Sequence, residues 1–221
     1  MANGGMKILF KYPTRGRPDW FKRTLELWLT LLSPHHEAIF LVAMDDDDWS
    51  MNNPAMQLYL NGLQQVAYYY KPHKNKIEAY NSGLEDRQFD VTMPIADDLL
   101  PQCESYDCIL AAAYLESWPK LNGAIHFNDG RTRRNRIGHP IIGRVLYDNL
   151  GYLTPPHYAA WSDRELNAVL VHRKALKHYP MVLFRHEWQK YGPDDTYNRA
   201  DKRHGEDKRI FLERKKAGLI L

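Results

Sequence analysis

The first hundred residues alternate short apolar runs with segments of helical periodicity, and this alternation constrains the fold more than any other feature of the sequence. Strands that are apolar along their whole length are typical of a sheet covered by helices on both faces. When such strands alternate with helices, the sheet is expected to be mostly parallel. We expect strands over residues 7–12, 38–44, 66–70 and 89–95, and helices over residues 19–32, 54–62 and 75–84.

The second half of the chain is less regular. We expect helices over residues 102–117, 141–150 and 206–216, strands over residues 121–127 and 181–184, and a turn at residues 128–130. A further helix should begin at Ser162, because a serine followed three residues later by a glutamate, here Glu165, is typical of a capping box. Leu166, Val169 and Leu170 would form its buried stripe. The predicted fold class is α/β, with a mostly parallel central sheet flanked by helices and a smaller C-terminal region.

Length and composition suit one large domain. The chain has 221 residues, of which 44% are hydrophobic, so it can bury a stable core without disulfide bonds or structural metal ions. With 30 basic and 27 acidic residues the formal net charge is +3, which does not by itself predict binding to nucleic acid. We expect a single domain over residues 1–221, with one half at about 6–101 and another at about 102–221 that ends in a charged tail.

Cysteine usage and hydropathy indicate the compartment. The two cysteines, Cys103 and Cys108, form no Cys-x-x-Cys pair, so we expect two reduced, partly buried thiols and no cysteine zinc site. No apolar run approaches the length that crosses a bilayer. Residues 1–5 lack the apolar region of a signal peptide. We therefore expect the protein to have no membrane span and to work in the cytoplasm.

Unusual chemistry gathers where the expected strands end. The first strand runs into a loop rich in proline and arginine (residues 13–18), the second into four aspartates (residues 45–48), and the fourth into Asp97 and Asp98. Ligands of open α/β sheets bind at the carboxyl ends of the strands. Clustered carboxylates repel one another unless a cation lies between them, and Mg²⁺ or Mn²⁺ completed by a substrate phosphate is a common solution. The sequence thus indicates a metal and phosphate site at this edge.

Five short motifs extend this pattern in a specific order. They are residues 13–17 (PTRGR), 45–46 (DD), 76–83 (KIEAYNSG), 97–101 (DDLLP), and 151–152 (GY) with 162–163 (SD). Their order resembles that of the inverting family 2 glycosyltransferases of the GT-A fold, over roughly residues 7–173. The sequence departs from the family pattern at Ile95, which replaces the first acid of the metal motif, and at Ser162, which replaces a glutamate.

The resemblance implies a nucleotide-sugar donor, with UDP-sugar favoured, bound by the first half of the chain. Asp97 would contact the donor ribose or the metal, and Asp98 would hold Mn²⁺ or Mg²⁺ together with His186, although ten histidines make a chance position a rival explanation. One of Asp45 and Asp46 would read the base. The other expected donor contacts are Pro13, Thr14, Arg17 and Lys76, with Asn81 holding a loop in place.

The resemblance also makes Asp163 the general base that takes the proton of an acceptor hydroxyl, with inversion at the sugar. An acid in the first turn of a helix is favoured by the helix dipole in any case. The acceptor would be a glycan or another hydroxyl, including modified DNA, as for phage or bacterial enzymes; the cytoplasm would then be that of a host. Arginines in residues 131–136 would bind a diphosphate or an anionic acceptor, or form a solvated loop. Tyr152, Tyr158 and Trp161 would stack on an acceptor sugar or belong to the core.

Three other functions are compatible with parts of the pattern. A nucleotidyltransferase would need a glycine-rich loop after the first strand, but residues 13–18 contain one glycine and two prolines. A metal-dependent phosphoesterase would need further paired acids and histidines. A non-catalytic module that binds a sugar nucleotide or nucleic acid would release no nucleoside diphosphate. The sequence leaves the oligomeric state open.

Overall fold

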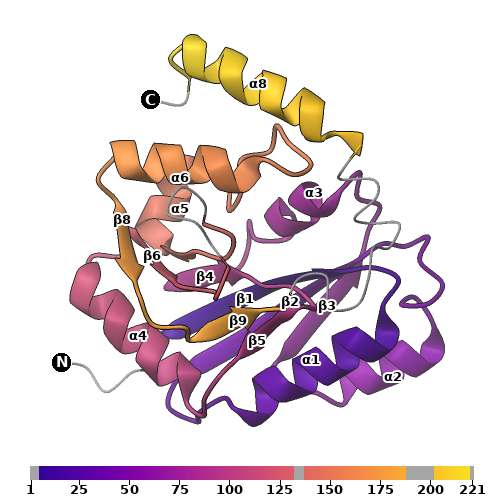
Figure 1. Cartoon of the computed structure of the whole chain (residues 1–221). Coiled ribbons are helices and arrows are strands. Elements are labelled where there is room, and N and C mark those ends of the chain that lie inside the picture. Colours follow the sequence, from indigo (N-terminus) through magenta and orange to yellow (C-terminus); the bar gives the residue numbers. More distant parts are fainter. Residues whose placement is uncertain (1–4, 132–136, 188–201, 220–221) are drawn as a thin grey trace.

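A computed structural model describes residues 5–131, 137–187 and 202–219. Its centre is a seven-stranded sheet with the strand order β3-β2-β1-β4-β7-β6-β8 (Figure 1). Neighbouring strands are parallel except at β7, which runs antiparallel to β4 and β6. The strands are β1 (Lys7–Thr14), β2 (Glu37–Met44), β3 (Val66–Tyr70), β4 (Val91–Pro94), β6 (Ala124–Phe127), β7 (Ile141–Gly143) and β8 (Leu176–Tyr179). The expected mostly parallel α/β sheet is confirmed.

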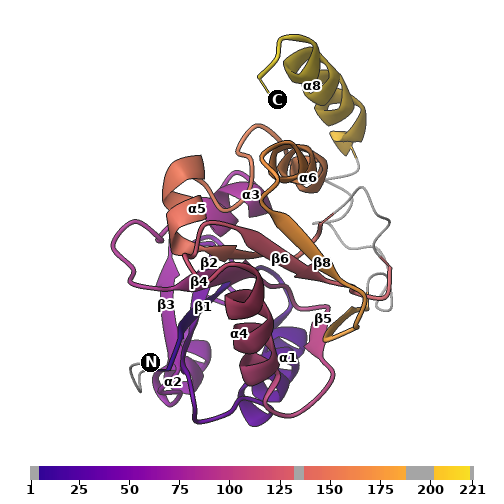
Figure 2. The same cartoon turned by 90° about the vertical axis from the view of Figure 1, so that its left-hand side faces the viewer.

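Helices cover both faces of this sheet, as Figures 1 and 2 show. One face carries α1 (Pro18–Thr30), α2 (Pro54–Asn61) and α4 (Tyr106–Ser117), and the other carries α3 (Lys76–Asn81), α5 (Arg144–Leu150) and α6 (Ser162–His172). Helix α8 (His204–Lys216) lies outside α6. No helix within the described ranges is long and apolar enough to span a membrane.

A small second sheet is attached to the core by aromatic packing. It pairs β5 (Leu99–Pro101) with β9 (Phe184–His186) in antiparallel fashion. Phe184 stacks on Trp28 of α1, and the centroids of their rings are 5.1 Å apart. Trp28 also packs against Phe10 of β1, with ring centroids 5.0 Å apart. The indole N–H of Trp28 donates to the backbone oxygen of Leu99 at 2.8 Å. The core therefore fixes both strands of the small sheet.

The first half of the chain follows the sequence expectations closely, but the second half departs from them. Residues 141–143 form β7 rather than the first turn of a helix, and α4 begins at Tyr106 rather than at residue 102. The late strand comprises residues 184–186 and not 181–184, and the sequence analysis missed β5 and β8. These strands have three or four residues, too few for a periodicity to be read.

The expected capping box at Ser162 is wrong. Trp161 occupies the N-cap position of α6, and Ser162 is already helical, without a capping side-chain hydrogen bond. Glu165 is 1% exposed and accepts instead from the Tyr158 hydroxyl and, in a two-fold contact, from Arg214 of α8. Leu166, Val169 and Leu170 are buried as expected. Both cysteines are free and half-buried, also as expected.

The close approach between α4 and the end of β7 yields a test of this packing. A Cβ added at Gly143 would lie 1.9 Å from the Tyr114 hydroxyl oxygen and 2.4 Å from the backbone oxygen of Leu121. The backbone at Leu121 cannot move away without disturbing the fold. Gly143→Ala should therefore lower the free energy of unfolding, measured by urea titration, by about 1–3 kcal/mol. Gly205→Ala is the control, because a Cβ there meets nothing within 4 Å, and it should leave stability equal or higher. Equal stabilities for the two variants would contradict this packing.

Candidate donor and metal site

The site lies where the strand order reverses between β1 and β4, the position at which open α/β sheets bind their ligands. β1 ends at Thr14, and three residues beyond β4 the chain reaches Asp97. The Thr14 hydroxyl donates to Asp97 Oδ2 at 3.2 Å, and Arg17 Nη1 lies 3.7 Å from the same oxygen. The structure thus brings together two segments that the sequence analysis placed at separate strand ends.

Asp97 is a buried carboxylate that is only partly satisfied. Its exposed fraction is 7%, and its Oδ1 accepts no hydrogen bond from the described residues. Burial raises the pKa of Asp97 to about 7, although the positive charge of Arg17 opposes the shift. A buried carboxylate oxygen without a partner is costly, so this atom favours a ligand or a cation.

The small sheet places His186 beside Asp98. In its register Leu99 lies opposite His186, and the Glu187 amide donates to the Asp98 carbonyl oxygen at 2.7 Å. As a result His186 Nε2 is 3.3 Å from Asp98 Oδ2. Burial alone would lower the pKa of His186, but its contacts with Asp129 and Asp98 outweigh burial and raise it to about 9.

Asp129 is a member of this cluster that the sequence analysis assigned only to a turn. Its carboxylate Oδ2 lies 3.7 Å from His186 Nδ1, and its carbonyl oxygen accepts from the His186 amide at 3.0 Å. The His139 ring is perpendicular to that of His186 at 5.1 Å, and it bonds the carbonyl oxygen of Pro94 through Nδ1 at 2.8 Å. The missed signal was the one that identified Asp97, an acid just after an apolar strand.

These residues fit a hard divalent cation. Buried carboxylates and a histidine form an oxygen-rich donor set, and the unpartnered Oδ1 of Asp97 supplies a free ligand atom. A carboxylate on the far nitrogen of a histidine is the arrangement that commonly orients metal-bound imidazoles, and Asp129 occupies that place relative to His186. The cluster therefore offers the types of ligand atom that Mn²⁺ and Mg²⁺ use, but among the described residues only His36, Asp107 and Cys108 bring three potential ligand atoms within 4.8 Å of one another.

The aspartate run at the end of β2 folds onto the loop after β1. Arg15 Nη1 contacts Asp45 Oδ2 at 2.6 Å and Asp47 Oδ1 at 2.5 Å, and the Gly16 amide donates to Asp48 Oδ2 at 2.6 Å. The Asp45 side chain is 13% exposed, whereas Asp46 is fully on the surface. Asp45 is therefore the acid of the pair that the fold orients.

The remaining expected site residues have diverse environments. Pro13 is half-buried near the end of β1, and Lys76 is exposed at the start of α3. Asn81 accepts from the amides of Leu153 and Thr154 at 2.8 and 2.9 Å and donates to the Thr154 carbonyl oxygen at 2.7 Å. It thus holds the segment that leads towards α6.

Asp163 is half-buried in the first turn of α6, where its Oδ1 accepts from the Arg164 amide at 2.9 Å. Of the aromatic residues expected near an acceptor, Tyr158 and Trp161 are buried, and Tyr152 is half-buried. The Arg131 amide donates to Asp129 Oδ1 at 2.9 Å. Residues 132–136 of the arginine-rich loop lie outside the described residues.

Helix α8 braces the segment before Asp163. Asp207 is fully buried, and its Oδ2 accepts from the amides of Ala159 and Ala160 at 2.9 and 2.7 Å. Arg214, in the last turn of the same helix, donates to both carboxylate oxygens of Glu165. The C-terminal helix therefore holds both sides of the α6 N-terminus.

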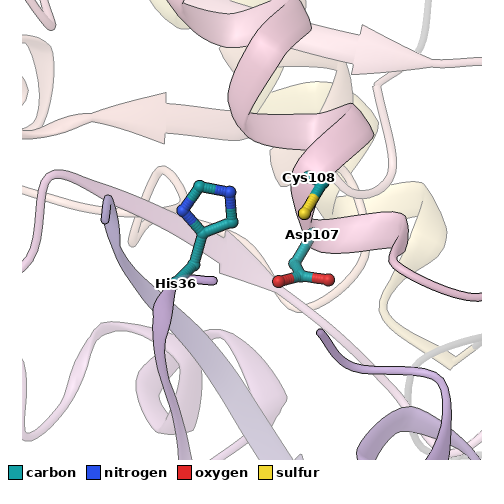
Figure 3. Close-up of side chains that lie close together, drawn as sticks. All are labelled: His36, Asp107 and Cys108. Atoms are coloured by element: carbon teal, nitrogen blue, oxygen red, sulfur yellow. The ribbon is translucent and has the colours of Figure 1, made fainter. Parts of the chain in front are cut away.

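A second group of potential metal ligands lies at the opposite end of β2. The ligand atoms of His36, Asp107 and Cys108 are within 4.8 Å of one another (Figure 3). Hydrogen bonds account for the group: both Asp107 oxygens accept from Ser33, and His36 Nδ1 accepts from the Met6 amide at 3.1 Å. A neutral imidazole that accepts at Nδ1 carries its proton on Nε2, so it presents no free nitrogen to a metal. The group links α4 to the loop before β2.

Comparisons with known proteins place this geometry in context. No protein-family model and no curated protein sequence matches the chain. Among solved structures, it resembles the mannosyltransferase PcManGT from Pyrobaculum calidifontis in complex with GDP-Man and Mn²⁺, at a TM-score of 0.65 and 13% identity, over 87% of this chain and 61% of the other. The chain has the GT-A glycosyltransferase fold.

Structures of S. aureus TarS (residues 1–349) share this GT-A fold. One aligns at a TM-score of 0.65 and 11% identity, over 83% of this chain and 61% of the other. The complex with UDP-GlcNAc aligns at 0.62 and 12% identity, over 87% and 64%. The chain thus spans about three fifths of the PcManGT chain and of TarS residues 1–349, and 36% of a longer S. aureus TarS structure.

The brace made by α8 can be tested through Asp207. Asp207→Ala leaves two buried amides without an acceptor, so it should lower the free energy of unfolding by about 2 kcal/mol. Asp207→Asn keeps an oxygen that can accept from both amides and should cost less. Urea titrations give the energies, and hydrogen exchange at Ala159 and Ala160 should accelerate in Asp207→Ala alone. Unchanged exchange at these amides would show that the brace does not exist.

Proposed function

We propose that the chain is a glycosyltransferase that moves a sugar from a UDP-sugar to a hydroxyl acceptor. The proposal is carried by one observation, the meeting of Thr14, Arg17, Asp97, Asp98 and His186 at the strand-order reversal. The solved structures of the same fold that carry GDP-Man, UDP and UDP-GlcNAc support it.

In this proposal Asp98 and His186 bind Mn²⁺ or Mg²⁺, and Asp97 serves the ribose or the same metal. When bound, the metal neutralises charge on the diphosphate that departs. Thr14 and Arg17 hold Asp97 in place from the loop after β1. Asp45, oriented by Arg15, accepts a hydrogen bond from the uracil imide, with Pro13 beside the base and Lys76 near the base or phosphates.

Asp163 is proposed as the general base. Its carboxylate would take the proton from the acceptor hydroxyl while that oxygen bonds to the anomeric carbon and the bond from this carbon to the diphosphate oxygen breaks. A single displacement from the opposite side inverts the anomeric centre. The donor sugar would be a hexose type, and the acceptor a glycan or another hydroxyl compound. The enzyme would act in the cytoplasm of a bacterium or of a phage-infected host.

Asp98→Asn tests the metal centre. Wild-type protein with Mn²⁺ should show a rise in melting temperature on adding UDP, and this rise should disappear without Mn²⁺. Loss of a ligand should weaken metal affinity by at least the roughly 10–100-fold that loss of a supporting residue costs. Asp148→Asn, on the exposed surface of α5, is the matched control and should keep the full shift. A full shift in Asp98→Asn would remove the metal role from this residue.

Asp163→Asn separates chemistry from donor binding. The variant should bind UDP with the wild-type affinity, because Asp163 belongs to the acceptor side of the proposed site. Transfer should fall by about 10²–10⁴-fold when a general base is lost. A panel of nucleotide-sugars and hydroxyl acceptors, with release of nucleoside diphosphate as the signal, measures the rate. Transfer at the wild-type rate would show that another group accepts the proton.

A further inference from the structure

A continuous chain of partly buried hydrogen bonds lies behind Asp45. Lys11 Nζ donates to Tyr69 Oη at 2.6 Å, and Tyr69 Oη donates to the Ser82 carbonyl oxygen at 2.9 Å and lies 2.6 Å from Ser82 Oγ. Ser82 Oγ is 3.0 Å from His73 Nε2, and His73 Nδ1 is 2.7 Å from Asp45 Oδ1. Four side chains from different parts of the fold therefore form a chain of contacts that ends on a single carboxylate.

This chain of contacts is unusual for its burial. Lys11 is 0% exposed, and the His73 side chain is 2% exposed. Burying a lysine and a histidine costs free energy unless each has hydrogen-bond partners. Here the partners are the successive members of the chain that ends at Asp45. The proposed metal site does not include His73.

The direction of the last hydrogen bond is fixed by chemistry. An ionised carboxylate can only accept, so His73 Nδ1 carries the hydrogen whether the ring is neutral or charged. Arg15 binds the other oxygen, Oδ2, at 2.6 Å. Burial alone would raise the pKa of Asp45, but the hydrogen bonds from His73 and Arg15 more than offset it and lower the pKa. Each oxygen keeps a second lone pair for a ligand.

We propose that His73 is a positioning residue for recognition of the donor base, because its Nδ1–H holds Asp45 as a hydrogen-bond acceptor in one orientation. This inference rests on the proposed function. A base that presents a ring N–H, as uracil does at N3, satisfies the free lone pair of Asp45. Cytosine presents a lone pair at the same ring position, so two acceptors would face each other. The site should therefore prefer UDP to CDP.

Two substitutions of His73 separate its donor from its volume. The amide nitrogen of asparagine lies near the position of Nδ1 and can still donate to Asp45, whereas that of glutamine lies near the position of Nε2. Titration calorimetry with Mn²⁺ would use UDP, CDP and pyrophosphate as ligands. His73→Gln should weaken UDP binding about tenfold, as expected when a hydrogen bond to a charged group is lost, and should bring the UDP/CDP ratio towards one. His73→Asn should retain most of the wild-type preference.

Pyrophosphate and an unrelated histidine provide the controls. Pyrophosphate lacks a base, so its affinity should be equal in wild type and in both His73 variants; a purely structural role would weaken it as well. His35→Ala changes an exposed histidine at the far end of β2 and should leave all three affinities unchanged. If His73→Gln does not fold, Tyr69→Phe removes the middle of the chain of hydrogen bonds and should lower the UDP/CDP ratio instead.

The outcomes distinguish the inference from the function on which it rests. Wild-type protein that binds neither UDP nor pyrophosphate overturns both. Wild-type protein that prefers UDP, with an unchanged UDP/CDP ratio in His73→Gln or, if that variant is unfolded, in Tyr69→Phe, overturns the role of His73 alone. Loss of the ratio in His73→Gln with retention in His73→Asn supports it.

Discussion

The contact between Thr14 and Asp97 is the point on which the rest of the site depends. It joins the ends of β1 and β4, the two strands between which the order of the sheet reverses. One carboxylate oxygen of Asp97 is buried without a partner among the described residues, and Arg17 Nη1 lies 3.7 Å from the other oxygen. In the proposed function a bound cation would satisfy this oxygen, so ligand binding would also stabilise the structure around Asp97.

The sequence predicts the first half of this molecule well because its strands are long, apolar and regularly separated by helices. The acids after these strands, Asp45, Asp97 and Asp98, could be placed at one edge by topology alone. The contribution of β9 could not be foreseen from periodicity, since a three-residue strand has none. His186 was singled out only by resemblance, and its structural partner Asp129 was read as part of a turn.

The wrong capping box shows a second limit of local patterns. Ser162 and Glu165 have the right spacing, but Glu165 is captured by Arg214, which lies 49 residues further along the chain. A buried two-fold contact with a guanidinium outweighs a cap that is worth about 1 kcal/mol. Local patterns also fail to reveal His73, because nothing around it in the sequence indicates that it contacts Asp45, 28 residues earlier in the chain.

The stack of Phe184 on Trp28 has a consequence for how this protein can change over evolution. Phe184 stands two positions before His186 in the same short strand, and its ring is clamped against the hydrophobic interior. A substitution in the core that tilts Trp28 would therefore also move the His186 imidazole. If His186 binds the metal as proposed, interior residues that touch no ligand would still affect the geometry of the site.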